Sequence, residues 1–168
     1  KRLGEYATWM HLRRDELRGI TNDSIQTARK AWNIMTSQDR SGRVVWWLDL
    51  ATVEGLIELT TQDSLQYFVW FAHDLIFRHQ VQTHGLNIVI NLGQMNLVSF
   101  VSMVPPSLTR KLEKFTIDIL PITTKQMYVM GSPTWCSVFL KLTRPFITEE
   151  MRQRMITVQK SKQLHNGL

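Results

Sequence analysis

Short apolar runs alternate with longer segments of helical periodicity along most of the chain. The runs at residues 44–48, 86–92 and 126–130 are rich in β-branched and aromatic side chains and have the length of strands. The second run is apolar on both faces of its pleat except at its asparagines, which is typical of a central strand covered by helices on each face. Because helices long enough for crossovers separate these runs, the pattern predicts an α/β fold with a mostly parallel central sheet flanked by helices.

Two helices are expected before the first of these strands. Residues 5–18 carry apolar side chains at helical spacing among arginines, which predicts an accessory helix. Ser24 can cap a second helix over residues 25–35, since a serine hydroxyl accepts a hydrogen bond from the first helical turn. Residues 38–43 contain Asp and Gly in turn-forming positions and lead into the first strand.

Two further helices are expected to flank the sheet. Residues 61–77 predict one long helix with a broad apolar face, and Thr61 or Asp63 is its candidate cap. A proline pair that ends at Pro106 starts the next helix, because proline is well accommodated in a first helical turn. Both helices must bury their apolar faces against the sheet.

The segment at residues 134–146 differs from the other helical segments because it is apolar on all sides. Lys141 and Arg144 are its only charged residues. A helix of this kind is either buried in the core or in contact with lipid. Its spacing alone leaves both alternatives open.

Composition and charge bound the class of protein. The chain has 168 residues, of which 43% are hydrophobic, and this is enough for one domain with a packed core. Its single cysteine, Cys136, excludes an intrachain disulfide framework and suits a reducing compartment, so we expect a cytoplasmic protein. A net charge of +6 and a pI near 9.8 favour contact with anionic lipid, nucleic acid or acidic protein surfaces without choosing among them. No segment reaches the ~18 apolar residues of a membrane span.

The sequence does not offer a catalytic or metal-binding set. His73, His79 and His84 do not share one helix face at the spacing of metal ligands, and no cysteine or carboxylate accompanies them at such spacing. Ser132 lacks the Gly-x-Ser-x-Gly frame of an exposed nucleophile. The basic residues between 110 and 125 lack the interleaved aromatic side chains that stack on single-stranded nucleic acid. We therefore expect no enzyme activity, no cofactor, no metal and no nucleic-acid partner.

Several motifs occur in an order that is characteristic of one lipid-binding family. They are Asp39, Gly42 and Arg43 before the first strand, Gly85-Leu86 at the second, Pro121 before the third, Ser132-Pro133, and Arg144-Pro145-Phe146 ahead of Arg154-Met155-Ile156. Over roughly residues 31–158 the chain resembles the CRAL-TRIO lipid-binding domain, the family of phosphatidylinositol and tocopherol transfer proteins. The resemblance implies a hydrophobic cavity beside the sheet and a non-enzymatic protein that binds a lipid or another small hydrophobic ligand.

The resemblance also implies a gate helix that closes over the cavity. In the family, a Lys-Pro-Phe motif stands at the position of residues 144–146 and ends this helix. By that match the gate is formed by residues 134–146. Its apolar side chains are Trp135, Phe139, Leu140, Leu142 and Phe146.

An apolar ligand needs a continuous hydrophobic wall, because each methylene removed from water contributes ~0.8 kcal/mol. The candidate wall residues lie on the expected helices and strands and are Trp46, Leu48, Phe68, Phe71, Leu75, Ile88, Ile90, Phe115, Ile119 and Val129. Ordinary core packing explains each of them equally well, since a filled core and a cavity require the same residue types. The candidate contacts to a headgroup or to an anionic membrane are Arg154, Lys125, Lys141 and Arg144.

A few positions depart from the family pattern. Asn91 stands where the family commonly has Asp. Members that bind phosphatidylinositol carry a Glu directly after the proline that matches Pro121 and a Lys at the position of Arg154. Here the first position is Ile122, which cannot accept a hydrogen bond, whereas Arg154 keeps the positive charge and can bind a phosphate, so half of this headgroup site is missing. The family's closing Leu-Pro and paired glycines are also absent after residues 164–168, so the domain is expected to be truncated.

Two classes of function follow from these observations. The first is a lipid-binding or lipid-transfer domain, peripheral on membranes, whose gate opens at an anionic membrane surface. The alternative is a protein-interaction or autoregulatory module of a larger signalling protein, with its cavity filled by side chains, as the divergent Asn91 and Ile122 suggest. The expected organisation is a helical segment at residues 1–36, the lipid-binding domain at 37–158 and a basic tail at 159–168.

Overall fold

A computed structural model of the chain describes residues 2–50, 59–93, 95–131, 134–143 and 148–158. Five strands of this part form one sheet, in the order β1-β2-β3-β4-β5. They are β1 (Ile34–Gln38), β2 (Val44–Asp49), β3 (Leu86–Asn91), β4 (Thr124–Met130) and β5 (Met155–Val158). β1 is antiparallel to β2, and the remaining neighbours are parallel. The predicted α/β class with a mostly parallel sheet is confirmed.

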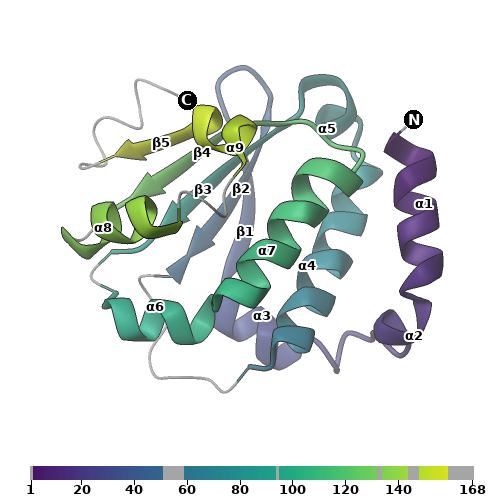
Figure 1. Ribbon diagram of the computed structural model, residues 1–168. Coiled ribbons are helices and arrows are strands. Elements are labelled where there is room, and N and C mark those ends of the chain that lie inside the picture. Colours follow the sequence, from purple (N-terminus) through teal and green to yellow (C-terminus); the bar gives the residue numbers. More distant parts are fainter. Residues whose placement is uncertain (1, 51–58, 94, 132–133, 144–147, 159–168) are drawn as a thin grey trace.

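The helices alternate with the strands in the order expected for crossover connections (Figure 1). They are α1 (Arg2–Leu12), α2 (Arg14–Leu17), α3 (Gln26–Trp32), α4 (Thr61–Ile76), α5 (His79–His84), α6 (Leu97–Met103), α7 (Pro106–Lys114), the π-helical turn η2 (Phe115–Ile119), α8 (Thr134–Thr143) and α9 (Glu149–Arg154). Figure 1 shows α4 and α7 side by side across the sheet, and α1 packs outside them against η2.

The two faces of the sheet carry different clusters. A right-handed crossover between parallel strands taken in chain order returns over the same face each time. Alternate strand residues such as Trp46 and Ile88 point into the large core on this face, beneath α4 and α7. The residues between them, such as Val89 and Tyr128, belong to a smaller cluster on the opposite face. β3 is therefore buried on both sides, as its sequence predicts.

The prediction of a helix over residues 25–35 is wrong over its last three residues. α3 ends at Trp32, and Asn33 adopts a left-handed conformation with a φ of 40°. A short polar side chain tolerates this conformation better than most residues, and it turns the chain out of the helix. The following residues then pair with β2 as the edge strand β1, through a turn at Asp39, whose carboxylate accepts hydrogen bonds from the backbone N–H groups of Ser41 and Arg43.

Helix caps also differ from the expected ones. The N-cap of α4 is Thr60, one residue before the expected Thr61, and Thr60 and Asp63 form a reciprocal capping box. Ser24 does not cap α3, because its hydroxyl donates to the carbonyl of Thr21 within the preceding turn. The proposed start of a helix at Pro106 is confirmed.

The accessory helix expected over residues 5–18 is two helices. α1 ends at Leu12 and α2 begins at Arg14, with Arg13 between them in a non-helical conformation. Trp9 of α1 packs against Phe115 with ring centroids 4.9 Å apart, so α1 is attached to the main core.

Candidate ligand cavity

An apolar cavity of about 200 Å³ lies between the sheet and the helices on its larger core face. Strands β2 to β5 form its floor, and residues of α3, α4, α6, α7, α8 and α9 close its sides. The residues that line it are Trp32, Trp46, Leu48, Leu50, Phe68, Ile88, Ile90, Leu92, Phe100, Val104, Thr109, Leu112, Glu113, Thr116, Met127, Val129, Trp135, Cys136, Met151 and Met155. The lining is apolar apart from the indole nitrogens of its tryptophans and a few polar side chains on α7 and η2.

The strand register builds the floor as rows of side chains. Successive strand residues alternate between the two faces, so every second residue faces the cavity. Trp46 of β2 pairs with Ile88 of β3, and the next such pair is Leu48 with Ile90. Ile90 in turn pairs with Val129 of β4, so the second row crosses three strands. A shift of the register by one residue would turn these side chains to the opposite face.

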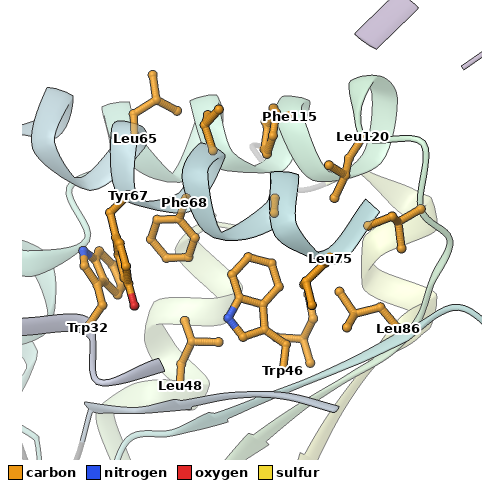
Figure 2. Close-up of a cluster of buried hydrophobic side chains, with 14 of the residues drawn as sticks. Trp32, Trp46, Leu48, Leu65, Tyr67, Phe68, Leu75, Leu86, Phe115 and Leu120 are labelled. Atoms are coloured by element: carbon orange, nitrogen blue, oxygen red, sulfur yellow. The ribbon is translucent and has the colours of Figure 1, made fainter. Parts of the chain in front are cut away.

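Six of the ten residues proposed from the sequence as cavity wall line this one cavity. They are Trp46, Leu48, Phe68, Ile88, Ile90 and Val129. Figure 2 shows Trp46 and Leu48 rising from the sheet toward Phe68 and Leu75 of α4. The sequence correctly placed these residues on the inner face of their elements, which is also the face that the cavity occupies.

The other four proposed wall residues lie in the core outside the lining. Leu75 shares a helix face with Phe68 but sits two turns further along α4, roughly 10 Å away from it. Phe71 stacks on Trp46, with ring centroids 5.2 Å apart, and does not line the cavity. Phe115 packs against α1, and Ile119 is buried in η2. Periodicity identifies the inner face of a helix but not the position of a cavity along it.

α8 closes one side of the cavity, at the place where the gate was expected. Its residues Trp135 and Cys136 line the cavity. The indole N–H of Trp135 donates to the carbonyl of Met95 at 2.9 Å, and its ring packs on Phe100 of α6 at 5.3 Å. These contacts join α8 to α6. Burial raises the pKa of the Cys136 thiol, which keeps it protonated and unreactive.

The rest of the predicted gate lies outside the description. Within α8 the backbone is helical, and Lys141 is exposed. The side chains of Phe139, Leu140 and Leu142, and the whole of residues 144–147 with Arg144 and Phe146, lie outside the described residues.

Polar groups in the lining are concentrated on one stripe of α7 and η2. The hydroxyls of Thr109 and Thr116 donate to the carbonyls of residues one turn earlier, at 3.3 and 2.8 Å. Glu113 accepts a hydrogen bond from the backbone N–H of Thr148 at 2.6 Å, which ties α7 to the N-terminus of α9. Thr148 itself caps α9 through the N–H of Met151. These polar groups therefore hold neighbouring elements together.

The three described residues among those proposed for a headgroup do not converge on the cavity lining. Arg154 donates to the carbonyl of Thr124 at 2.7 Å and forms an ion pair with Glu150, so it joins α9 to the start of β4. Lys125 is exposed beside Thr124, and Lys141 is exposed on α8. The position expected to hold an acidic residue, Ile122, is buried in the core.

α6 is an element that the sequence analysis missed. Phe100 of α6 and Val104, which directly follows it, line the cavity, whereas Leu97, Val98 and Val101 are exposed to solvent. The available signal was local: Asn96 caps the helix by accepting from the N–H of Ser99, and an amphipathic run follows. α6 thus presents apolar surface immediately beside α8.

Other candidate chemistry is limited in the part of the chain that the structure describes. The Tyr6 hydroxyl lies 2.8 Å from His73 Nδ1, so this histidine joins α1 to α4. Among the described residues, no group of three His, Cys, Asp or Glu side chains is placed to hold a metal ion. None of the described helices combines the length and hydropathy needed to cross a bilayer.

The comparisons with known proteins agree with this architecture. The CRAL/TRIO domain family matches residues 28–167. No curated protein matches the chain. The crystal structure of Sfh5 superposes with a TM-score of 0.67 at 14% sequence identity, over 93% of this chain and 58% of that one. The chain thus spans less than two thirds of Sfh5, and at this identity the likeness demonstrates the fold alone.

Proposed function

The chain belongs to the CRAL/TRIO domain family, and on that premise we propose that it binds a lipid or another small hydrophobic ligand in the cavity over its sheet. Proteins of this family are generally lipid-binding carriers rather than enzymes. The observation that carries the proposal is a cavity of about 200 Å³ whose lining is almost entirely apolar. In a packed core the side chains fill the available space, so an unfilled apolar cavity is not explained by core packing.

The dimensions of the cavity constrain the ligand. Burying hydrocarbon there contributes ~0.8 kcal/mol for each methylene removed from water. Its volume of about 200 Å³ is below the ~300–1,000 Å³ of typical small-molecule pockets. A cavity of this volume suits one small hydrophobic molecule or a single chain, and a larger lipid requires outward movement of α8. The volume favours ligand binding over an interaction module whose cavity is filled by side chains.

We place the gate at α8. Trp135 of α8 contacts Met95, just before α6, and Phe100 of α6, at the edge of the cavity. Opening breaks these contacts and exposes the apolar wall. At a membrane surface the exposed wall meets lipid instead of water, which lowers the free energy of the open form.

We place the membrane-facing surface at α6, next to this gate. The exposed side chains Leu97, Val98 and Val101 provide an apolar face that can enter the interfacial region of a bilayer. Lys141 is exposed on the adjoining α8, and the net charge of +6 favours an anionic surface. Apolar surface beside positive charge is the requirement for reversible peripheral binding.

The test is native mass spectrometry of the folded protein after incubation with mixed liposomes, using one variant that fills the cavity and one that does not. Val104→Trp introduces a large side chain at the lining position that directly follows α6, and Leu12→Trp introduces the same side chain at an exposed position of α1. We expect a stoichiometric bound lipid with the unmodified protein and with Leu12→Trp, and loss of that lipid with Val104→Trp. A folded protein that takes up no lipid refutes the proposal, as does equal loading of both variants.

A further inference from the structure

We propose that Trp46 is the polar anchor of the cavity, and that its indole N–H donates a hydrogen bond to an oxygen carried by the buried part of the ligand. The cavity then selects hydrophobic molecules with a carbonyl or hydroxyl oxygen over pure hydrocarbons. This inference rests on the proposed function and adds a specificity-determining residue to it.

Trp46 differs from the other two tryptophans that line the cavity. The indole N–H of Trp32 donates to the hydroxyl of Ser64 at 3.2 Å, and that of Trp135 donates to the carbonyl of Met95 at 2.9 Å. Trp46 is only 2% exposed, and its Nε1 is buried without an acceptor among the described residues. Buried donors in proteins are nearly always paired, so an unpaired one in the wall of a cavity points to a partner that enters from outside.

The orientation of the ring turns this donor toward a residue of the cavity lining. Figure 2 shows the indole nitrogen on the side of the ring that is turned toward Leu48 and away from Leu75. Leu48 lines the cavity, whereas Leu75 does not. Stacking on Phe71, with an interplanar angle of 22°, and contact with Phe68 hold the ring in place. The donor is therefore fixed before a ligand binds, which reduces the entropy lost on binding.

The other polar groups of the cavity lining do not serve as acceptors for the Trp46 N–H. The hydroxyls of Thr109 and Thr116 are already donated to backbone carbonyls, and Glu113 accepts from the N–H of Thr148. All three belong to α7 and η2, whereas Trp46 lies on the floor beside the apolar Leu48. A bound water needs two to four polar partners, and the apolar neighbours of this donor do not provide them. A ketone oxygen needs only the single donor.

The test compares two probes that differ in one group. Hexylbenzene and hexanophenone have the same length, and a carbonyl in hexanophenone replaces the methylene next to the ring. The substitution Trp46→Phe removes the N–H and keeps an aromatic ring. We expect it to raise the dissociation constant of hexanophenone about tenfold and that of hexylbenzene by less than about twofold. The change in hexylbenzene affinity measures the effect of the altered cavity shape alone. The ratio of the two changes in dissociation constant therefore measures the contribution of the hydrogen bond.

Trp32→Phe is the matched control, because its N–H already has a protein partner in Ser64. It should change the binding of both probes equally. An independent measurement uses the indole N–H signals of the six tryptophans in a ¹⁵N-labelled sample of the unmodified protein. The Trp46 signal, assigned by its loss in Trp46→Phe, should move downfield with hexanophenone and stay in place with hexylbenzene.

The outcomes separate this inference from the proposed function. Equal weakening of both probes by Trp46→Phe, or an indole signal that does not respond to the ketone, overturns the role of Trp46 while leaving a ligand cavity. Failure of both probes to bind the unmodified protein refutes the proposed function and this inference with it. If Trp46→Phe does not fold, the Trp46 signal is assigned from through-bond and NOE connectivities in the unmodified protein, and its response still decides the question.

Discussion

Trp32 and Trp46 form a natural pair for testing how hydrogen bonding contributes to the stability of the ligand-free protein. Both side chains are 2% exposed, and both contact Phe68, with ring centroids 4.7 and 5.6 Å away. They differ in one respect: the Trp32 N–H is bonded to the buried hydroxyl of Ser64, and the Trp46 N–H has no acceptor among the described residues. We predict that Trp32→Phe destabilises the protein more than Trp46→Phe does.

The magnitude follows from the two environments. Each substitution removes a similar apolar area, which costs about 1 kcal/mol in both cases. Trp32→Phe also leaves Ser64 buried without its donor, and an unsatisfied buried polar group costs about 1–3 kcal/mol. Trp46→Phe removes a donor that is already unsatisfied, so the corresponding term is favourable. We expect the two variants to differ in free energy of unfolding by about 2 kcal/mol, or roughly 4–8 °C in Tm for a domain of this size.

The assay is urea unfolding of delipidated protein, monitored by far-UV circular dichroism. The midpoint of Trp32→Phe should lie below that of Trp46→Phe, with equal m-values, because a change in m would indicate altered compactness of one state. Ser64→Ala completes a double-mutant cycle with Trp32→Phe, and the two substitutions together should cost less than the sum of their separate effects. Equal midpoints, or a lower midpoint for Trp46→Phe, would refute the assignment of an unpaired donor to Trp46.

Two further predictions concern the membrane surface and the response to acid. Val98→Asp on α6 should reduce sedimentation with anionic liposomes several-fold. Leu12→Asp on the distant α1 is the control and should not reduce it, since Leu12 is 76% exposed and Val98 is 73% exposed. Equal effects of the two substitutions would exclude α6 as the membrane-facing element. For Asp39, burial alone would raise the pKa of the carboxyl, but hydrogen bonds from Ser41 and Arg43 and the charge of Arg43 outweigh it and hold the pKa below its usual 3.8. Because the pKa is lower in the folded state, the ionised Asp39 stabilises the fold above pH 3.8, and this contribution is lost as the pH falls through the folded-state pKa. The urea midpoint of Asp39→Asn should therefore fall less between pH 5 and pH 3 than that of the unmodified protein. Parallel decreases in the two midpoints would contradict this expectation.

Local sequence patterns were sufficient for most elements of the fold. The strands at residues 44–48, 86–92 and 126–130 and the long helix that became α4 were predicted close to their observed bounds. Each has a strong periodicity that depends only on neighbouring residues. Ile34 and Met35 were assigned to a helix because their apolar character fits either period. The left-handed Asn33 and the pairing with β2 decided in favour of a strand. That pairing depends on residues on the other side of the turn, so local periodicity does not reveal it.

The candidate site divides in the same way. Residue types and spacing indicated which side chains face the interior, and the order of motifs correctly indicated the family. They could not separate Phe68, which lines the cavity, from Leu75, which fills the core two turns away on the same helix face.

What the sequence determined by itself is therefore the class of fold, the family and the inward faces of the elements, because these depend on residue type and on periodicity over a few neighbouring positions. The tertiary structure alone decided where a cavity of about 200 Å³ remains, that α6 borders it, and which of the lining tryptophans has no acceptor among the described residues. Volume and hydrogen-bond pairing are properties of atoms that come together from distant segments. Trp32 meets Ser64 from 32 residues away and Trp135 meets Met95 from 40.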